Sequence, residues 1–195
     1  AEALHLNLSD LAKRVQAHPH MRFVYLARQV NPEQAEWIDK LHLPGINLRD
    51  ESRRFYPAGH VAANLLGFTN IDNHGIEGVE KSFNAQLTGK AGRRLVRKDR
   101  HGHVIENITE VAAVPAHNLQ LSMDERLQTV TEDALDNAVS WNKAESGAAV
   151  LIKIDTGEIL SMASYPDFNP NNRDNARLDD FRNRAISDTF EPGST

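Results

Sequence analysis

The chain has 195 residues, of which 40% are hydrophobic and 25% charged, with a formal net charge of −5 and no cysteine. This balance fits one ordinary globular domain or two small ones, and it excludes a disordered, fibrous or disulfide-stapled chain. The negative charge argues against nucleic-acid binding, and no apolar run approaches the roughly 20 residues that span a bilayer. The start AEALHLNLSD lacks the order of a signal peptide, so any membrane or export segment is expected outside this chain.

The start of the chain is expected to form a small α+β unit of helix, strand and helix. In LNLSDLAKRVQAHPH, Ser9 is the expected N-cap of a short helix that Pro19 stops. The alternation of side chains in RFVYLARQV, residues 22–30, predicts a strand.

A second helix is expected in NPEQAEWIDKLHLPG. Asn31 is its N-cap, Pro32 takes the first helical position and Gln34 can close a capping box. Pro44 and Gly45 are expected to end this helix.

The middle of the chain is richer in glycine and is expected to hold short elements. Residues 53–69 and 92–108 contain short β-like pieces, and residues 78–89 read as a helical piece. Gly102, in the stretch KDRHGHV, marks the tip of a hairpin. Residues 110–118 are expected to connect to a second unit.

A long amphipathic helix is expected in LSMDERLQTVTEDALDNAVSWNKA. Ser122 and Glu125 form a capping box at its start. Its apolar side chains recur at intervals of three and four, and such a stripe is expected to lie on other parts of the protein. The stripe consists of Leu127, Val130, Ala134, Ala138 and Trp141.

A hairpin is expected in GAAVLIKIDTGEILSMASYP, with a turn at Asp155–Gly157 and a glycine where a left-handed residue is wanted. In the first strand, Val150 and Ile152 alternate with Leu151 instead of with charged residues. Both faces of this strand are therefore expected to be covered, as in a central strand, with the preceding helix covering one of them.

The second unit is expected to be incomplete in this chain. A hairpin with one helix cannot cover two apolar faces, and an isolated hairpin is marginal in water. Residues 167–195 add a polar loop and a short helix but no predicted strand. We therefore expect exposed apolar surface on this unit.

Ser194, in the closing stretch FEPGST, has two readings. After Pro–Gly it stands where a helix begins, so it can be an ordinary helix cap. It can also be a nucleophile whose base is a lysine three residues onward, on the same helical face. That lysine would lie beyond Thr195.

Two further features of the sequence are candidate binding sites. His18 with His20, and His101 with His103, could place imidazoles side by side, but no carboxylate or third histidine stands at a persuasive spacing, so no metal or other cofactor is expected. The basic run RRLVRKDRH is interrupted by aspartate and has no interleaved aromatic residues. A solvated or ion-paired hairpin is expected there instead of a nucleic-acid site.

Six stretches together resemble class B penicillin-binding proteins, the D,D-transpeptidases of peptidoglycan synthesis. They are, in order, RFYPAG, GIEGVEKSFNAQLTGKAG, RKDRHGHVI, LSMDERLQ, GAAVLIKIDTGEILSMASYPDFNPN and RNRAISDTFEPGST. The resemblance spans nearly the whole chain and is strongest to the septal, cell-division members of Gram-negative bacteria.

The resemblance implies an α+β fold made of two parts. Residues 1–117 would form the non-catalytic pedestal domain. Residues 118–195 would form the first helix and hairpin of a transpeptidase domain of the serine β-lactamase-like type, incomplete in this chain and ending at the start of the Ser-x-x-Lys motif.

The resemblance also implies a role for Ser194. It matches the serine that attacks the D-Ala–D-Ala carbonyl of a stem peptide, with its backbone N–H as one donor of the oxyanion hole. The lysine of this motif and the later Ser-x-Asn and Lys-Thr-Gly motifs are absent from the chain. The chain alone is therefore expected to be inactive.

Other matching residues resemble the pedestal of the family and are interpreted as structural. Arg54 could pair with Glu77 or Glu80 and tie segments together, and the glycines suit turns and close approaches. The matching residues are Arg54, Tyr56, Pro57, Gly59, Gly75, Gly78, Glu80, Leu87, Gly89 and Gly92.

The expected partners follow from the resemblance alone. They are the D-Ala–D-Ala stem peptide, β-lactam antibiotics, and division proteins including a lipid-II polymerising glycosyltransferase, with no nucleic acid. The expected location is the periplasm, with an inner-membrane anchor outside this chain. The alternative hypothesis is a non-catalytic fragment that docks division or cell-wall synthesis partners.

Overall fold

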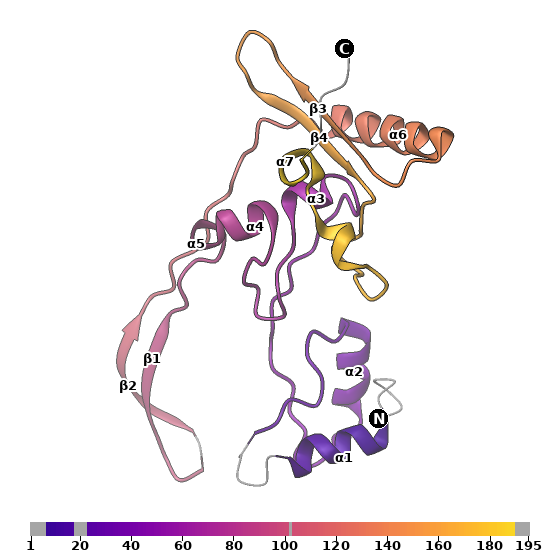
Figure 1. The fold of residues 1–195 in the computed structure, drawn as a ribbon. Coiled ribbons are helices and arrows are strands. Elements are labelled where there is room, and N and C mark those ends of the chain that lie inside the picture. Colours follow the sequence, from indigo (N-terminus) through magenta and orange to yellow (C-terminus); the bar gives the residue numbers. More distant parts are fainter. Residues whose placement is uncertain (1–6, 18–22, 102, 190–195) are drawn as a thin grey trace. The chain divides into compact units, whose positions relative to one another are not determined.

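The computed structural model describes residues 7–17, 23–101 and 103–189, which form helices and strands in two compact units (Figure 1). The first unit comprises residues 1–54 and the second residues 55–195. The expected α+β class is confirmed. Within the described ranges, every helix is too short or too polar to cross a membrane.

The first helix, α1 (Leu8–Gln16), is capped by Asn7 and not by Ser9 as predicted. The Asn7 Oδ1 accepts hydrogen bonds from the Ser9 backbone N at 3.0 Å and from the Ser9 Oγ at 2.9 Å. Asparagine and serine are both good caps, and the helix starts two residues earlier than the sequence pattern indicated. Pro19 lies outside the described residues.

The second helix, α2 (Pro32–Lys40), begins as predicted. Pro32 is the first helical residue, and the Asn31 backbone N donates to the Gln34 Oε1 at 3.3 Å. The helix ends at Lys40, before Pro44, and Gly45 follows with a left-handed φ of +83°.

The predicted strand at residues 22–30 is wrong over its described part, residues 23–30, which form bends and irregular backbone. Side chains hold this segment instead: Phe23 and Tyr25 meet edge to face with ring centroids 4.7 Å apart, and Arg28 stacks on the Tyr25 ring. The Arg28 Nε also pairs with the Glu51 Oε1 at 2.9 Å. An alternating pattern makes a strand only where a second strand lies alongside, and the described residues of this unit provide none.

The second unit opens with turns and short helices. The β-like pieces predicted in residues 53–69 are wrong, because turns and a helix occupy this stretch, with one isolated bridge from Thr69 to Gly75. The helical piece predicted at residues 78–89 is confirmed, divided into two helices at Phe83. The helices are α3 (Ala63–Leu66), α4 (Gly78–Ser82) and α5 (Asn84–Leu87).

The predicted hairpin at residues 92–108 is confirmed as β1 (Arg93–Lys98) paired antiparallel with β2 (Val104–Val111). An ion pair crosses it, with the Arg97 Nη1 2.9 Å from the Glu106 Oε2, so the basic run is partly ion-paired as expected. All eight residues of β2 are exposed. Gly102, predicted at the tip, lies outside the described residues.

The long helix α6 (Glu125–Asn142) forms where predicted, but Asp124 caps it and not Ser122. The Asp124 Oδ1 accepts from the backbone N of Arg126 at 2.9 Å and of Leu127 at 3.1 Å. The Ser122 Oγ donates to the Ile159 carbonyl oxygen at 2.7 Å and so joins the helix start to a strand.

The packed face of α6 is not the predicted apolar stripe. Val130 and Trp141 of that stripe are 65% and 88% exposed. The buried residues of the helix are Gln128 and Val139. Each directly follows a residue of the predicted stripe, Leu127 or Ala138. The Gln128 side chain makes two hydrogen bonds to the Met162 backbone, and these fix which face of the helix points inward.

The second hairpin consists of β3 (Gly147–Ile152) and β4 (Ile159–Tyr165), with Gly157 at the predicted turn and φ +73°. The buried strand is β4 and not β3. Val150, Leu151 and Ile152 of β3 are 41–52% exposed, so the prediction that both faces of β3 are covered is wrong for this chain, while the expected exposed apolar surface is confirmed.

Consecutive residues of β4 contact elements on its two faces. The Ser161 Oγ lies 2.8 Å from the Thr131 Oγ1 of α6. The next residue, Met162, meets the Asn183 side chain, which precedes the short helix α7 (Arg184–Ser187). Because side chains of a strand alternate between faces, α6 and α7 lie on opposite sides of β4.

A small aromatic core joins distant segments of the second unit. Phe68 follows α3, Phe168 follows β4, and Phe181 ends the 3₁₀ helix η2 (Leu178–Phe181). Their ring centroids are 4.8–5.8 Å apart. Arg173 stacks over Phe68 at 4.2 Å, so the core is closed by a cation–π contact.

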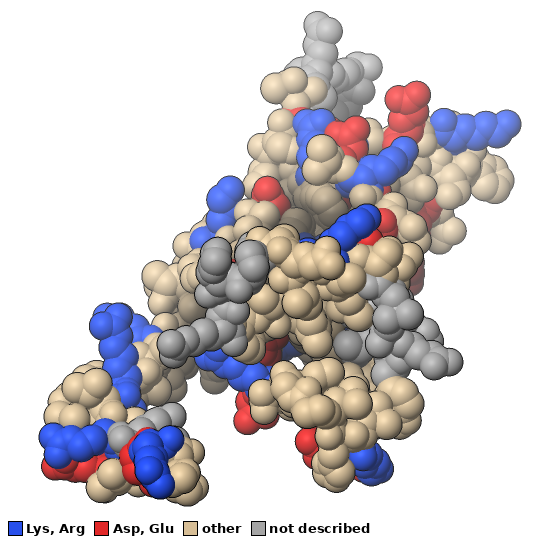
Figure 2. All heavy atoms as spheres, turned by 90° about the horizontal axis from the view of Figure 1, so that it is seen from below, with Lys and Arg blue, Asp and Glu red and all other residues tan. Residues whose placement is uncertain are grey.

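Charged side chains of both signs are interspersed on the face shown in Figure 2. This face carries no broad field of one sign, which agrees with the weak net charge of −5.

The packed face of α6 can be tested with two valines of the same helix. In the 195-residue chain, Val139→Ala is expected to lower the free energy of unfolding by about 2 kcal/mol, because it removes two buried methyl groups. Val130→Ala, the matched control, is expected to change it by less than about 0.5 kcal/mol. Urea denaturation measures both, and equal losses would contradict the assignment of the buried face.

Candidate functional site

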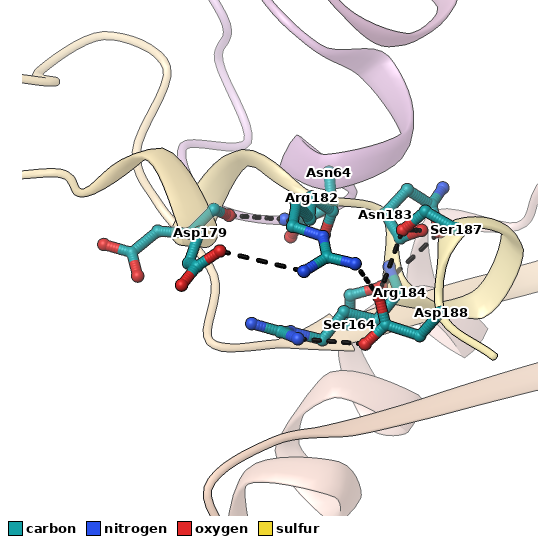
Figure 3. Close-up of polar contacts among 9 residues, drawn as sticks. Asn64, Ser164, Asp179, Arg182, Asn183, Arg184, Ser187 and Asp188 are labelled. Atoms are coloured by element: carbon teal, nitrogen blue, oxygen red, sulfur yellow. Dashed lines mark hydrogen bonds and ion pairs between the residues drawn. The ribbon is translucent and has the colours of Figure 1, made fainter. Parts of the chain in front are cut away.

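The predicted nucleophile Ser194 lies outside the described residues. The described chain leads toward it through η2 and α7 as far as Thr189. Polar contacts hold this approach segment, residues 182–188, against α3 and β4 (Figure 3).

Asn64 fixes the start of the approach segment. Its Nδ2 donates to the carbonyl oxygen of Asp180 at 2.7 Å and to that of Arg182 at 3.1 Å. Asn64 is buried, so these two bonds satisfy a donor that burial would otherwise leave without acceptors.

Ser164 fixes the next residues onto β4. Its Oγ accepts from the Arg184 backbone N at 3.0 Å and lies 3.5 Å from the Asn183 Oδ1. The Asn183 Nδ2 in turn meets the Met162 Sδ at 3.3 Å. The first residue of α7 is therefore attached directly to the buried strand.

Asp188, at the end of α7, forms ion pairs with two arginines. The Arg184 Nη1 lies 2.9 Å from the Asp188 Oδ2, and the Arg182 Nη2 contacts the Asp188 Oδ1 (Figure 3). The hydrogen bond from Arg184 is the main cause that lowers the pKa of Asp188 below its ordinary value, and the charges of both arginines add to it. Asp188 therefore carries its negative charge at neutral pH.

Two residues of the predicted pedestal motif meet in the structure. The Tyr56 Oη donates to the Glu80 Oε1 at 3.3 Å, and both residues are buried. The Tyr56 backbone also exchanges two hydrogen bonds with the Asn171 side chain, at 3.0 and 2.8 Å. Tyr56 thus joins the motif to the loop after β4.

The other motif residues are in turns and at close approaches. Pro57 is exposed in a turn, and the ion pair predicted for Arg54 stays a prediction. Four of the five motif glycines pass so near a neighbouring backbone that a Cβ would clash with it; these are Gly75, Gly78, Gly89 and Gly92. Gly59 differs, because a Cβ there would meet only the side-chain Nδ2 of Asn169, at an ordinary contact distance of 3.8 Å.

Glu132 of α6 forms a half-buried acidic site with residues near α3. Its Oε1 accepts from the Ala62 N at 2.8 Å and from the Gln128 Nε2 at 2.7 Å, while its Oε2 is buried without an acceptor or donor among the described residues. Burial raises the pKa of Glu132; the two hydrogen bonds and His60 oppose this rise, and Asp167 adds to it. Burial likewise raises the pKa of Asp167.

The histidine pairs do not build a metal centre in the described part of the chain, where no group of three potential ligands comes together. His101 and His103 have ring centroids 6.3 Å apart, and the His103 Nδ1 lies 3.1 Å from the Asp99 Oδ2. His18 and His20 lie outside the described residues.

The sequence patterns indicate no role for Asn64, Ser164, Arg182, Arg184 or Asp188. One local signal was present in RNRAISD, because Arg184 and Asp188 are four residues apart and a helix places such residues on one face. The contacts of Ser164 with Asn183 and Arg184 span 19 and 20 positions. Those of Asn64 with Asp180 and Arg182 span 116 and 118 positions, and short spacings reveal neither set.

Two family models match the chain. The model described as the penicillin-binding protein dimerisation domain matches residues 1–121, and the penicillin-binding protein transpeptidase domain matches residues 147–195. The first match covers more than half of the chain, so the chain belongs to the penicillin-binding proteins, and the resemblance found in the sequence is confirmed.

The curated relatives include peptidoglycan D,D-transpeptidase FtsI of Escherichia coli K12, which is 58% identical over 195 residues. The protein of the same name from Buchnera aphidicola subsp. Schizaphis graminum is 49% identical over 195 residues. Both alignments cover 100% of this chain but 33% and 34% of the relatives. The chain therefore spans about a third of the length of the curated relatives it matches.

Solved structures share the fold. A peptidoglycan synthetase from Bifidobacterium adolescentis superimposes with a TM-score of 0.64 and 26% identity, covering 100% of this chain and 35% of that one. Penicillin-binding protein 3 of Mycobacterium tuberculosis, in complex with ampicillin, gives a TM-score of 0.60 and 32% identity, covering 73% and 28% of the two chains.

The structural role of the motif glycines can be tested with a pair of similar backbone conformation. Gly59 and Gly78 have φ of +64° and +62°, but a Cβ at Gly78 would overlap the Leu65 carbonyl and lie 2.7 Å from the Gly67 N. Gly78→Ala is expected to destabilise the chain by more than about 3 kcal/mol, and Gly59→Ala by about 1 kcal/mol from backbone strain alone. Denaturant titration gives both values; similar losses would contradict the close approach at Gly78.

Glu132 makes the stability of the second unit depend on pH. Its folded pKa is raised above its ordinary value of 4.5, so its protonation contributes stability that is fully present below that value and is lost as pH rises through the folded pKa. Glu132→Gln stays neutral, so its free energy of unfolding relative to wild type is expected to rise with pH from about 4 to 8.

Thermal and urea unfolding across this pH range measure the difference between the two proteins. Asp133→Asn, which removes one exposed charge from the same helix, controls for net charge. A difference between Glu132→Gln and wild type that stays constant with pH would show that the carboxyl group is not buried as described.

Proposed function

We propose that the protein to which this chain belongs is a peptidoglycan D,D-transpeptidase that cross-links stem peptides at the division septum. The observation that carries the proposal is the 58% identity, over all 195 residues, to the peptidoglycan D,D-transpeptidase FtsI of Escherichia coli. The match of residues 147–195 to the transpeptidase family supports it independently.

In this function Ser194 is the nucleophile. Its hydroxyl oxygen attacks the carbonyl carbon of the penultimate D-Ala, the terminal D-Ala leaves with a proton on its amine, and an acyl-enzyme forms. An amine of a neighbouring stem peptide then attacks this ester, which forms the new amide and returns the proton to Ser194. The Ser194 backbone N–H stabilises the oxyanion in both steps.

β-Lactams would acylate the same serine, and the ampicillin complex of the Mycobacterium tuberculosis relative supports this assignment. We further propose a periplasmic location, with an inner-membrane anchor outside this chain, and division partners that include a lipid-II polymerising glycosyltransferase. The proposed functional boundary lies between residues 117 and 118, with the pedestal before it and the transpeptidase domain after it.

A second candidate function is that of an interaction module. It is favoured by the match of residues 1–121 to a dimerisation domain and by the exposed hairpin of β1 and β2, where Leu95, Ile105 and Ile108 are 50–66% exposed. In this case the 195-residue chain acts as a catalytically silent fragment that docks division or cell-wall synthesis proteins.

Labelling with a fluorescent penicillin distinguishes the two functions. The full-length protein is expected to form a covalent adduct on the peptide that contains Ser194, detected by gel fluorescence and peptide mass, and Ser194→Ala is expected to abolish it. The 195-residue chain is expected to form none, because it lacks the lysine of the Ser-x-x-Lys motif. A full-length protein that stays unlabelled, or a labelled Ser194→Ala variant, would overturn the transpeptidase assignment.

A further inference from the structure

We propose that Asp188, held between Arg182 and Arg184, is a positioning residue that fixes the end of α7, six positions before the proposed nucleophile Ser194. This inference rests on the proposed function, because it concerns the reactivity of Ser194. Asp188 itself is not placed in contact with the substrate.

Both oxygens of the Asp188 carboxylate are held by arginine side chains. Each Asp188 oxygen takes a different guanidinium: Oδ1 contacts the Arg182 Nη2, and Oδ2 lies 2.9 Å from the Arg184 Nη1 (Figure 3). Charge-assisted bonds to both oxygens fix the plane of the carboxylate as well as its place. The lowered pKa of Asp188 agrees with this arrangement.

The backbones of both arginines are attached to the core of the unit. The Arg182 carbonyl accepts from the buried Asn64, and the Arg184 backbone N donates to Ser164 of the buried strand β4. Asp188 is therefore linked to α3 through Arg182 and to β4 through Arg184. A displacement of Asp188 would require one of these ion pairs or backbone hydrogen bonds to break.

The cluster of Asp188 and its two arginines is less exposed than an ordinary surface ion pair. Exposed pairs contribute little, because water screens them and long side chains lose freedom. The Arg184 side chain is 13% exposed and that of Asp188 30%, whereas Arg182 is 46% exposed. The pair of Arg184 and Asp188 is thus the stronger constraint, and Arg182 adds a weaker one.

The cluster constrains the end of α7. Asp188 is the residue where α7 ends and the backbone turns extended, with φ −86° and ψ 139°. Ser194 follows six positions later in the sequence. The carboxylate therefore fixes the point from which the nucleophile segment departs, and displacements of about 1 Å at a nucleophile lower rates by about a hundredfold.

The test uses the full-length protein, with acylation by a chromogenic β-lactam followed in single turnovers. Asp188→Asn is expected to lower the acylation rate constant by at least about tenfold, with the non-covalent dissociation constant and the thermal midpoint nearly unchanged. Asp188→Glu is expected to restore part of the rate. Asp179→Asn, which removes a carboxylate 3.8 Å from Arg182 in the same cluster, is the matched control and is expected to react within about twofold of wild type.

Wild-type acylation by folded Asp188→Asn, or a loss confined to the dissociation constant, would overturn the proposal. If Asp188→Asn does not fold, the Arg182→Gln variant tests the proposal, because it removes only the more exposed of the two ion pairs of Asp188. A reduction of about threefold or more in its acylation rate constant supports the positioning role, and a smaller change overturns it. Ser194→Ala is tested alongside, since labelling of that variant would refute the transpeptidase function itself and not the role of Asp188.

Discussion

The free edge of β4 is closed by a side chain, and the second unit depends on this contact. The Gln128 amide accepts from the Met162 N at 2.8 Å and donates to the Met162 carbonyl at 2.9 Å, which replaces the ladder bonds of a neighbouring strand. The Asp124 N donates to the Leu160 carbonyl farther along the same edge. A buried backbone group without a partner costs about 1–3 kcal/mol, so the edge could not be buried without these groups. Covering by a helix also prevents pairing with other chains.

Once its edge is closed, β4 can serve as the support for both of its neighbours. Ser161 faces α6, while Met162 and Ser164 face the residues at the start of α7. The polar cluster of Arg182, Arg184 and Asp188 is built on that second face. The approach to the proposed nucleophile, residues 182–188, is therefore held by a buried strand. Its own regular structure is only the four-residue helix α7, whose local hydrogen bonds alone would fix it less firmly.

Most features with local causes could be predicted from the sequence, although the N-caps of α1 and α6 lie two residues from the predicted ones, and features with distant causes could not. The capping box of Asn31 and Gln34 and the turn at Gly157 depend on neighbouring residues, and both are present as predicted. The inward face of α6 depends on Met162, 34 positions from Gln128, and apolar spacing pointed to the wrong side. At the candidate site, the family resemblance supplied the Ser194 assignment, which stays a prediction. The contacts that hold residues 182–188 come from α3 and β4, and no short motif encodes them.

The contacts of Tyr56 have a consequence for how such genes can recombine. Tyr56 and Asn64 fall in the region matched by the dimerisation family, and their partners Asn171 and Asp180 fall in the region matched by the transpeptidase family. The contact between Phe68 and Phe168 likewise joins a residue of the dimerisation region to one of the transpeptidase region. The two regions are therefore not interchangeable modules. A mosaic gene joined near residue 121 inherits two half-interfaces from different parents, and only crossovers between alleles that agree at these contacts preserve the shared core.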